Sequence, residues 1–234
     1  MDEGQQLRHI DAELNGLRAA TLRMGGLVEE QVADAMESLL EGKEELAGTV
    51  IARDDLIDAM EVETDTLATR IMVRRQPMAS DLRLVISVMK ITTHLERIGD
   101  EAQKIARMAK LALEESHLSR PHFWEVHGMG GQAQSMLHDV LDAFARMDAG
   151  IAGDLGRKDK LLDESFRSTM RSLITFVMED PRTITHVFEV LWVVKALERI
   201  GDHAKNIAEY VIYAVKGEDV RHLSLENKER IAHD

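Results

Sequence analysis

Pairs of carboxylates separated by four residues recur along this chain and are its clearest chemical signal. Glu96 pairs with Asp100 in this way, and Glu198 pairs with Asp202. On an α-helix, residues four apart project from the same side, so each pair places two carboxylates together. Like charges held close must be neutralised by protonation or by a bound cation. Oxygen ligands suit hard ions such as magnesium, calcium, manganese or iron, so these pairs are candidates for a metal site.

Both pairs belong to a motif that occurs twice. The stretch 95–106 returns as the stretch 197–208, with nine of the twelve positions identical. Apolar residues recur in both copies at steps of three and four, which predicts a buried helix stripe beside the acids. Each copy contains a glycine, Gly99 or Gly201, that costs roughly 1 kcal/mol relative to alanine inside a helix. We therefore expect another part of the chain to approach the backbone closely at each glycine.

The duplication extends over most of the chain. A shift of 105 residues aligns the glycine pair Gly25 and Gly26 with Gly130 and Gly131. The same shift aligns further acids, which are Asp34 with Asp139, Asp54 with Asp159, and Asp58 with Asp163. The two motif copies align at a shift of 102, so the second half is three residues shorter. A period of this length repeats a whole domain and does not build a solenoid of small units.

Composition favours an all-α fold. Hydrophobic residues make up 44% and charged residues 30% of the 234, as in a globular protein, while aromatics are only 4% and methionines number 13. That balance suits helix packing better than sheets. The three prolines fall between helical patterns. These breaks predict six long helices, at about 7–40, 44–74, 80–115, 122–147, 149–178 and 183–216.

The helices and the repeat together predict two tandem, internally duplicated three-helix bundles. The first bundle is expected at residues 7–116 and the second at 117–217, joined near 116–121. A polar C-terminal tail follows at 218–234, and we expect it to be less ordered. A chain of 234 residues is long enough for two domains of common size.

Several classes of protein are disfavoured. The chain has no cysteine, which rules out disulfides, thiolate metal sites and a thiol nucleophile. Its N-terminus is polar and acidic, and no apolar run approaches the ~18 residues of a membrane span, so we expect a cytoplasmic protein without direct membrane insertion. The formal net charge of −13 opposes binding to nucleic acid. No phosphate loop, Ser-His-Asp order or dinucleotide glycine pattern is present, so we expect no enzyme.

Other interpretations of the acids remain open. They can be solvated or salt-bridged flanks of the helices, with Arg97 and Arg199 as counter-charges, in a metal-free adaptor. They can also belong to a carboxylate-bridged di-metal enzyme. Such sites in helical bundles need Glu-x-x-His pairs on two helices. Only Glu114 with His117 has that spacing here, at an expected helix end. Repetition of the whole acid set in both halves favours the metal-binding interpretation.

With the doubled motif in view, the chain resembles the PhoU family of bacterial phosphate-uptake regulators. Further matching stretches lie at 75–83, 138–144 and 213–221, and the resemblance runs from about residue 7 to 222. It implies two tandem three-helix bundles with multinuclear metal clusters, of iron or zinc in some members and magnesium or manganese in others. The ligands that it implies are Asp54, Asp58, Glu96, Asp100, Asp159, Asp163, Glu198 and Asp202, with Asp34 and Asp139 as weaker candidates.

The same resemblance implies a regulatory role. Proteins of this family restrain the phosphate regulon when phosphate is plentiful, by linking the ATPase subunit of the phosphate ABC transporter to a PhoR-type sensor histidine kinase. Those two proteins, and a second copy in a homodimer, are the expected partners. Ser135 stands where the first half has Glu30, so the two halves need not hold equal amounts of metal.

Overall fold

Long helices make up nearly all of the molecule. A computed structural model describes residues 3–114 and 123–234 and, within these ranges, contains seven α-helices and no strand. The helices are α1 (Glu3–Glu41), α2 (Glu44–Arg75), α3 (Ser80–Glu114), α4 (Phe123–Arg146), α5 (Ala149–Glu179), α6 (Ile184–Lys216) and α7 (Leu225–His233), with a 3-10 turn at Pro181–Thr183. The all-α prediction and its six long helices are confirmed, whereas the expected junction at 116–121 lies outside the described residues.

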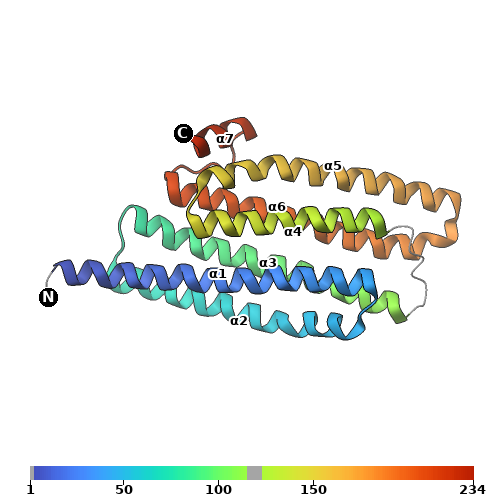
Figure 1. Cartoon of the computed structure of the whole chain (residues 1–234), viewed down its shortest axis with the longest axis horizontal. Helices are drawn as coiled ribbons and strands as arrows, with labels where there is room; N and C mark the ends of the chain where they lie inside the picture. Colours follow the sequence, from blue (N-terminus) through green and yellow to red (C-terminus); the bar gives the residue numbers. More distant parts are fainter. Residues whose placement is uncertain (1–2, 115–122) are drawn as a thin grey trace.

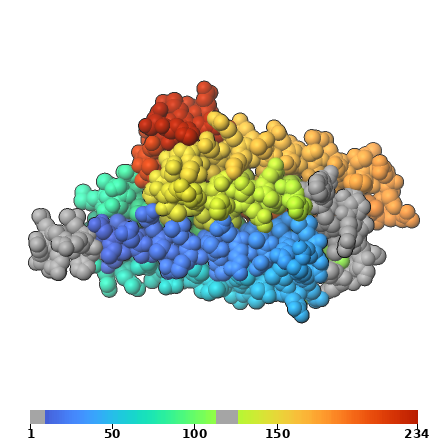
Figure 2. Space-filling model, viewed as in Figure 1, coloured from blue at the N-terminus to red at the C-terminus, as the bar shows by residue number. Residues whose placement is uncertain are grey.

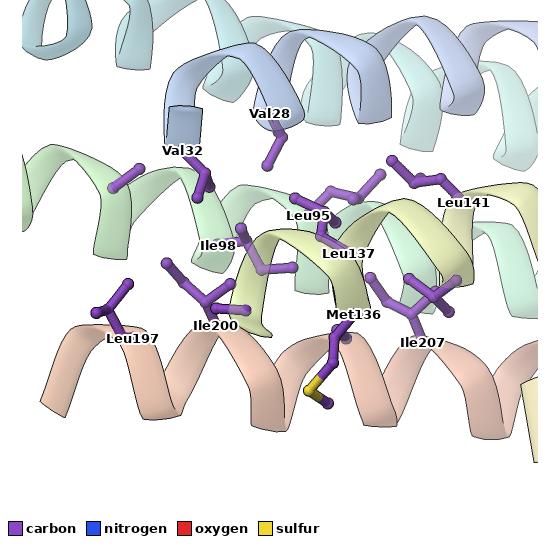
Figure 3. Close-up of a cluster of buried hydrophobic side chains, with 14 of the residues drawn as sticks. Val28, Val32, Leu95, Ile98, Met136, Leu137, Leu141, Leu197, Ile200 and Ile207 are labelled. Carbon is purple, nitrogen blue, oxygen red and sulfur yellow. The ribbon is translucent and has the colours of Figure 1, made fainter. Parts of the chain in front are cut away.

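The two halves are three-helix bundles that lie side by side (Figure 1). Helices α1, α2 and α3 pack on one another, as do α4, α5 and α6, while α3 runs along α6 and α1 contacts α4. Figure 3 shows side chains from both halves meeting in the interior, among them Ile98 of α3 and Ile200 of α6, each with none of its surface exposed. The two bundles therefore share one hydrophobic core.

Contact between α1 and α4 follows the internal repeat. A Cβ added at Gly25 would lie 2.5 Å from Cδ2 of Leu141, and one added at Gly130 would lie 2.5 Å from Cε of Met36. Met36 and Leu141 are 105 residues apart, as are the two glycines. Each half therefore presents its glycine to the same position of the other half, as in a two-fold symmetric dimer.

The close approach expected at the motif glycines is confirmed. A Cβ added at Gly99 would lie 3.2 Å from Cδ1 of Ile57 and 3.5 Å from Oδ1 of Asp54. At Gly201 it would lie 2.3 Å from Cδ2 of Leu162. Glycine thus lets α2 pack tightly on α3, and α5 on α6, at the level of the paired acids.

The expectation of weaker order in residues 218–234 is wrong. Val220 is fully buried, the side chain of Ser224 accepts a hydrogen bond from the Asn227 amide, and α7 packs on α5. Figure 2 shows these C-terminal residues (red) seated on the surface of the second half. Three glycines on one face of α5 admit the helix: Gly150 faces His233, Gly153 faces Ala232 and Gly156 faces Leu225. The signal for this docking lies in α5 and not in the polar tail.

Gly153→Ala is expected to loosen α7. Its added methyl would lie 2.6 Å from Cβ of Ala232, an atom that no rotamer can move away. Overpacking of this kind costs roughly 1–3 kcal/mol, so amide hydrogen exchange in α7 should accelerate by about tenfold or more. Gly48, which aligns with Gly153, has nothing within 4 Å of its added Cβ. Gly48→Ala should therefore stabilise the protein by up to about 1 kcal/mol and leave α7 unchanged; equal exchange in both variants would contradict the docking described.

Candidate metal centre

Four acids of the first half lie on α2 and α3 near enough to influence one another's charge, and we call them the first acid cluster. Its members are Asp54, Asp58, Glu96 and Asp100. Asp54 is the most enclosed, with 7% of its surface exposed, and its Oδ1 lies over Gly99. Within the described part of the chain, no lysine or arginine forms an ion pair with any of the four. The sequence-predicted ligands of this half therefore lie near one another without a direct ion pair, and Arg107 and Arg97 act on Asp54 and Glu96 only from farther away.

Electrostatics in the first acid cluster oppose ionisation of Asp54 and Glu96. Burial raises the pKa of Asp54, and repulsion from Asp100 and Asp58 raises it further. Burial, with repulsion from Asp100, Glu61 and Asp58, raises the pKa of Glu96 to about 7. Carboxyl groups in such a state take up a proton or a cation to relieve the repulsion.

Gln31 of α1 joins the first acid cluster to the backbone beneath it. Its Nε2 donates hydrogen bonds to Oδ1 of Asp54 and to the carbonyl oxygen of Gly99, each at 3.2 Å. The side chain is fully buried, and its Oε1 has no hydrogen-bond partner among the residues that the structure describes. This unpartnered buried amide oxygen, on a side chain that contacts Asp54, is a further oxygen donor of the kind that hard cations prefer.

The second acid cluster, formed by Asp159, Asp163, Glu198 and Asp202, differs because it contains ammonium groups. Nζ of Lys205 donates to Oδ2 of Asp159 and to Oδ1 of Asp202, at 2.9 Å each. Burial lowers the pKa of Lys205, but these two bonds, together with the charge attraction of the same two acids, outweigh burial and raise the pKa above its ordinary value. Lys195 contacts Oε2 of Glu198 at 2.6 Å.

The weaker candidates Asp34 and Asp139 have cationic partners of their own. Nη1 of Arg53 lies 2.9 Å from Oδ2 of Asp34, and its Nη2 contacts Glu30 at 3.2 Å. In the second half Lys158 pairs with Asp139 and reaches Oγ of Ser135 at 3.0 Å. Arg53 and Lys158 directly precede Asp54 and Asp159, so the same ion pair occurs once in each half. Both acids are therefore salt-bridged, and their role as metal ligands stays a prediction.

The two acid clusters differ in the groups that surround their carboxylates. The first offers only oxygen donors and has no ammonium group among them, whereas Lys205 already bridges two acids of the second. Within residues 3–114 and 123–234, no three Asp, Glu or His side chains stand close enough to ligate one ion together. Cation binding in the first cluster therefore requires its carboxylates to turn toward one another.

Three histidines lie near the acids and form hydrogen bonds with other side chains. Nδ1 of His94 lies 3.2 Å from Nδ1 of His203, across the contact between α3 and α6. Burial, with repulsion from His203, lowers the pKa of His94 to about 4, and burial lowers the pKa of His203 as well, so both shifts favour a neutral pair. His138 contacts Glu29 at 3.0 Å. Of the Glu114–His117 pair considered for a di-metal enzyme, Glu114 ends α3 and His117 lies outside the described residues.

Two residues of the site were missed by sequence reasoning, Gln31 and Lys205. Their signal is present in the repeat, because Gln31 aligns with Met136 and Lys205 aligns with Gln103. These exchanges replace an amide with a thioether and an amide with an ammonium group. Differences between the two copies, and not only their identities, therefore mark the site.

The pKa of Glu96 predicts a pH-dependent stability for the metal-free protein. Its folded pKa of about 7 lies above the ordinary value of 4.5, so the folded state binds more protons between these values and stability falls as pH rises through them. Glu96→Gln should increase the free energy of unfolding at pH 8 by about 1–2 kcal/mol, after discounting for solvent screening, and change little at pH 4. Urea unfolding with EDTA tests this. Glu198→Gln, which removes a carboxylate paired with Lys195, should bring no such gain.

Comparison with known proteins places the chain in a family. The family model described as PhoU domain matches residues 21–109 and 126–211. The phosphate-specific transport system accessory protein PhoU homolog of Pseudomonas aeruginosa is 49% identical over 218 residues, covering 93% of this chain and 90% of the relative. The accessory protein PhoU of Escherichia coli K12 is 42% identical over 227 residues, covering 95% and 93%.

Solved structures agree with the sequence matches. The crystal structure of PhoU from Pseudomonas aeruginosa superposes with a TM-score of 0.86 at 48% identity, covering 89% of this chain and 99% of that one. The regulatory protein PhoU from Streptococcus pneumoniae has a TM-score of 0.83 at 32% identity, covering 90% and 99%. Within the described ranges, the helices fall short of the apolar length that a membrane span needs. The match to the family model, the relatives and the solved structures together show that the chain belongs to the PhoU family.

Proposed function

We propose that this chain is an accessory regulator of phosphate-specific transport, which restrains the phosphate regulon when phosphate is plentiful. The observation that carries the proposal is the match to relatives named as accessory proteins of the phosphate-specific transport system, over more than 90% of this chain. Those names describe accessory proteins and not enzymes, in agreement with a regulatory role. The proposal includes a cytoplasmic location and a homodimer.

The finer part of the proposal concerns partners. We place the chain between the ATPase subunit of the phosphate ABC transporter and a PhoR-type sensor histidine kinase. A bundle whose halves share one core supplies a stiff surface for two such partners, because packed interiors transmit strain and do not deform continuously. Affinity capture with the tagged full chain, from cells grown with abundant phosphate, should recover both proteins. Recovery of neither would defeat this part.

The proposal also assigns a metal to the first acid cluster. Asp54 and Asp58 from α2, with Glu96 and Asp100 from α3, would hold the ion or a multinuclear cluster of iron, zinc, magnesium or manganese. A bound cation would supply the directly paired positive charge that none of these acids has among the described residues. The four carboxylates would then join α2 to α3 where the two helices approach at Gly99. Elemental analysis of the purified protein separates this proposal from a metal-free adaptor.

Regulation itself is tested in a deletion strain that carries a phosphate-regulon reporter. Loss of the gene should raise reporter activity in phosphate-rich medium, and the wild-type chain should restore repression. The Asp54→Asn/Asp100→Asn variant links the metal site to the role, since it removes two ligands and leaves the helical surface intact. Full repression by a metal-depleted variant would show that the site does not serve regulation, while the transport role would stand.

A further inference from the structure

We propose that Lys205 takes the place of a metal ion in the second half, so that this chain binds hard divalent cations only at the first acid cluster. The proposal rests on the metal site of the proposed function and concerns which half of the chain can bind a divalent cation. It departs from an equal role for both halves, which a simple duplication would predict.

The ammonium group of Lys205 lies where a bridging cation would be needed. It contacts Asp159 of α5 and Asp202 of α6 at 2.9 Å each. Lys205 therefore links the two helices and offsets the repulsion between these two carboxylates. The Lys205 side chain is only 29% exposed and that of Asp159 only 13%. A bidentate ammonium contact in a partly buried site neutralises charge and satisfies hydrogen-bond acceptors together.

The first half has no equivalent of this lysine. Gln103 stands at the matching position, and its Nε2 donates to the carbonyl oxygen of Ile51 at 3.4 Å instead of to an acid. The neighbouring Lys104 is directed to Glu101, which is 4% exposed, at 2.9 Å. The two clusters thus have matching acids, but among the described residues only the second has a lysine in direct contact with them.

A second lysine adds to the difference between the two acid clusters. Lys195 pairs with Glu198, while the first half has Thr93 at the matching position, whose hydroxyl donates to the carbonyl oxygen of Met89. Three of the four acids in the second cluster therefore have lysine partners. Met136 also replaces Gln31 and lies 3.5 Å from the Cβ position of Gly201, so the second half lacks the buried amide oxygen.

The C-terminal helix closes the same region. A hollow of about 200 Å³ beside Lys205 is lined by Asp159 and Gly156 of α5, Glu209 of α6, and Leu225 and Lys228 of α7. A cation entering here meets Lys228 as well as Lys205, and the like charges repel it. The first half has no such covering helix within the described part of the chain.

Reciprocal exchange of the two aligned residues tests the proposal. In the full chain at low ionic strength, Mn²⁺ should broaden NMR signals around Gly99 and leave those around Gly201 sharp. Lys205→Gln should add broadening around Gly201 and tighten Mn²⁺ binding there by about tenfold or more, because it removes a unit charge from a partly buried site. Gln103→Lys should weaken Mn²⁺ binding at the first cluster by a similar factor.

A metal-free arm keeps the test independent of Mn²⁺ affinity. With EDTA, Lys205→Gln should lower the melting temperature by about 3–8 °C, and Gln103→Lys should raise it or leave it unchanged, since one variant removes a counter-charge and the other adds one. A rise in melting temperature for Lys205→Gln would overturn the proposal.

The outcomes separate this inference from the proposed function. Equal broadening in both halves of the wild type would overturn the role of Lys205 and leave the first metal site standing. Broadening only around Gly201, and only in the Lys205→Gln variant, would support the role of Lys205 and defeat the first site. Absence of Mn²⁺ from all three proteins would overturn both.

Discussion

Exchange of Asp54 for Asn is expected to weaken Mn²⁺ binding to the protein by about 100-fold or more, since loss even of groups that only support ligands costs 10–100-fold. Asp54 is the most enclosed acid of the first cluster, and its position is set on two sides, by the Gln31 amide and by the Gly99 backbone. Asn keeps the shape and the amide contact but lacks the charge. Competition titration against a fluorescent chelator at pH 8 measures the change.

The stability of the metal-free Asp54→Asn variant shows whether its loss of Mn²⁺ affinity comes from misfolding. Because burial and neighbouring acids raise the pKa of Asp54, its carboxylate costs folding free energy above its ordinary pKa, and Asn removes that cost. Asp54→Asn should therefore unfold at higher urea concentration than the wild type when no metal is present. Asp159→Asn is the matched variant of the second half and should leave Mn²⁺ binding unchanged. Equal losses of affinity in the two variants would contradict the assignment of the site to the first half.

Much of the fold follows from the spacing of apolar residues. Ile91, Leu95 and Ile98 recur at steps of three and four, and all three are fully buried in α3. A helix of this period has one face to bury, so the pattern identifies both the element and its inner side. The motif glycines were predictable for a related reason, because glycine inside a helix is costly unless something packs against it. The docking of α7 was not predictable from the tail, since the glycine face that receives it lies on α5.

The candidate site was predictable only in part. A spacing of four places Glu96 and Asp100 on one side of α3, but it does not say which residues of other helices face them. That information is tertiary: Gln31 comes from α1, and the ion pair of Asp34 comes from Arg53 on α2. Charge pattern alone also cannot separate an open acid cluster from one bridged by a lysine. Here the internal repeat helps, because the Gln103 to Lys205 exchange occurs at aligned positions.

Lys228→Met is expected to lower the free energy of unfolding by about 3 kcal/mol, the cost of leaving a buried charge without its partner. Lys228 of α7 pairs with Glu209 of α6, and their side chains are only 17% and 9% exposed. Methionine keeps the aliphatic length of the lysine and removes its charge. The loss cannot exceed the free energy that docks α7, because the helix can detach and expose Glu209 to water. Urea unfolding measures the loss of global stability, and hydrogen exchange in α7 measures detachment of the helix.

The double variant Lys228→Met/Glu209→Gln decides whether charge or packing holds α7 in place. If the unpaired Glu209 carboxylate causes the loss, replacing it with a neutral amide should restore most of the stability, because removing both partners of a buried pair is far less costly than removing one. Arg230 and Asp234, an exposed pair of the same helix at 3.8 Å, supply the control. Arg230→Met should change stability by less than about 0.5 kcal/mol. A Lys228→Met variant as mild as that control would mean that the glycine face of α5, and not the ion pair, holds the helix.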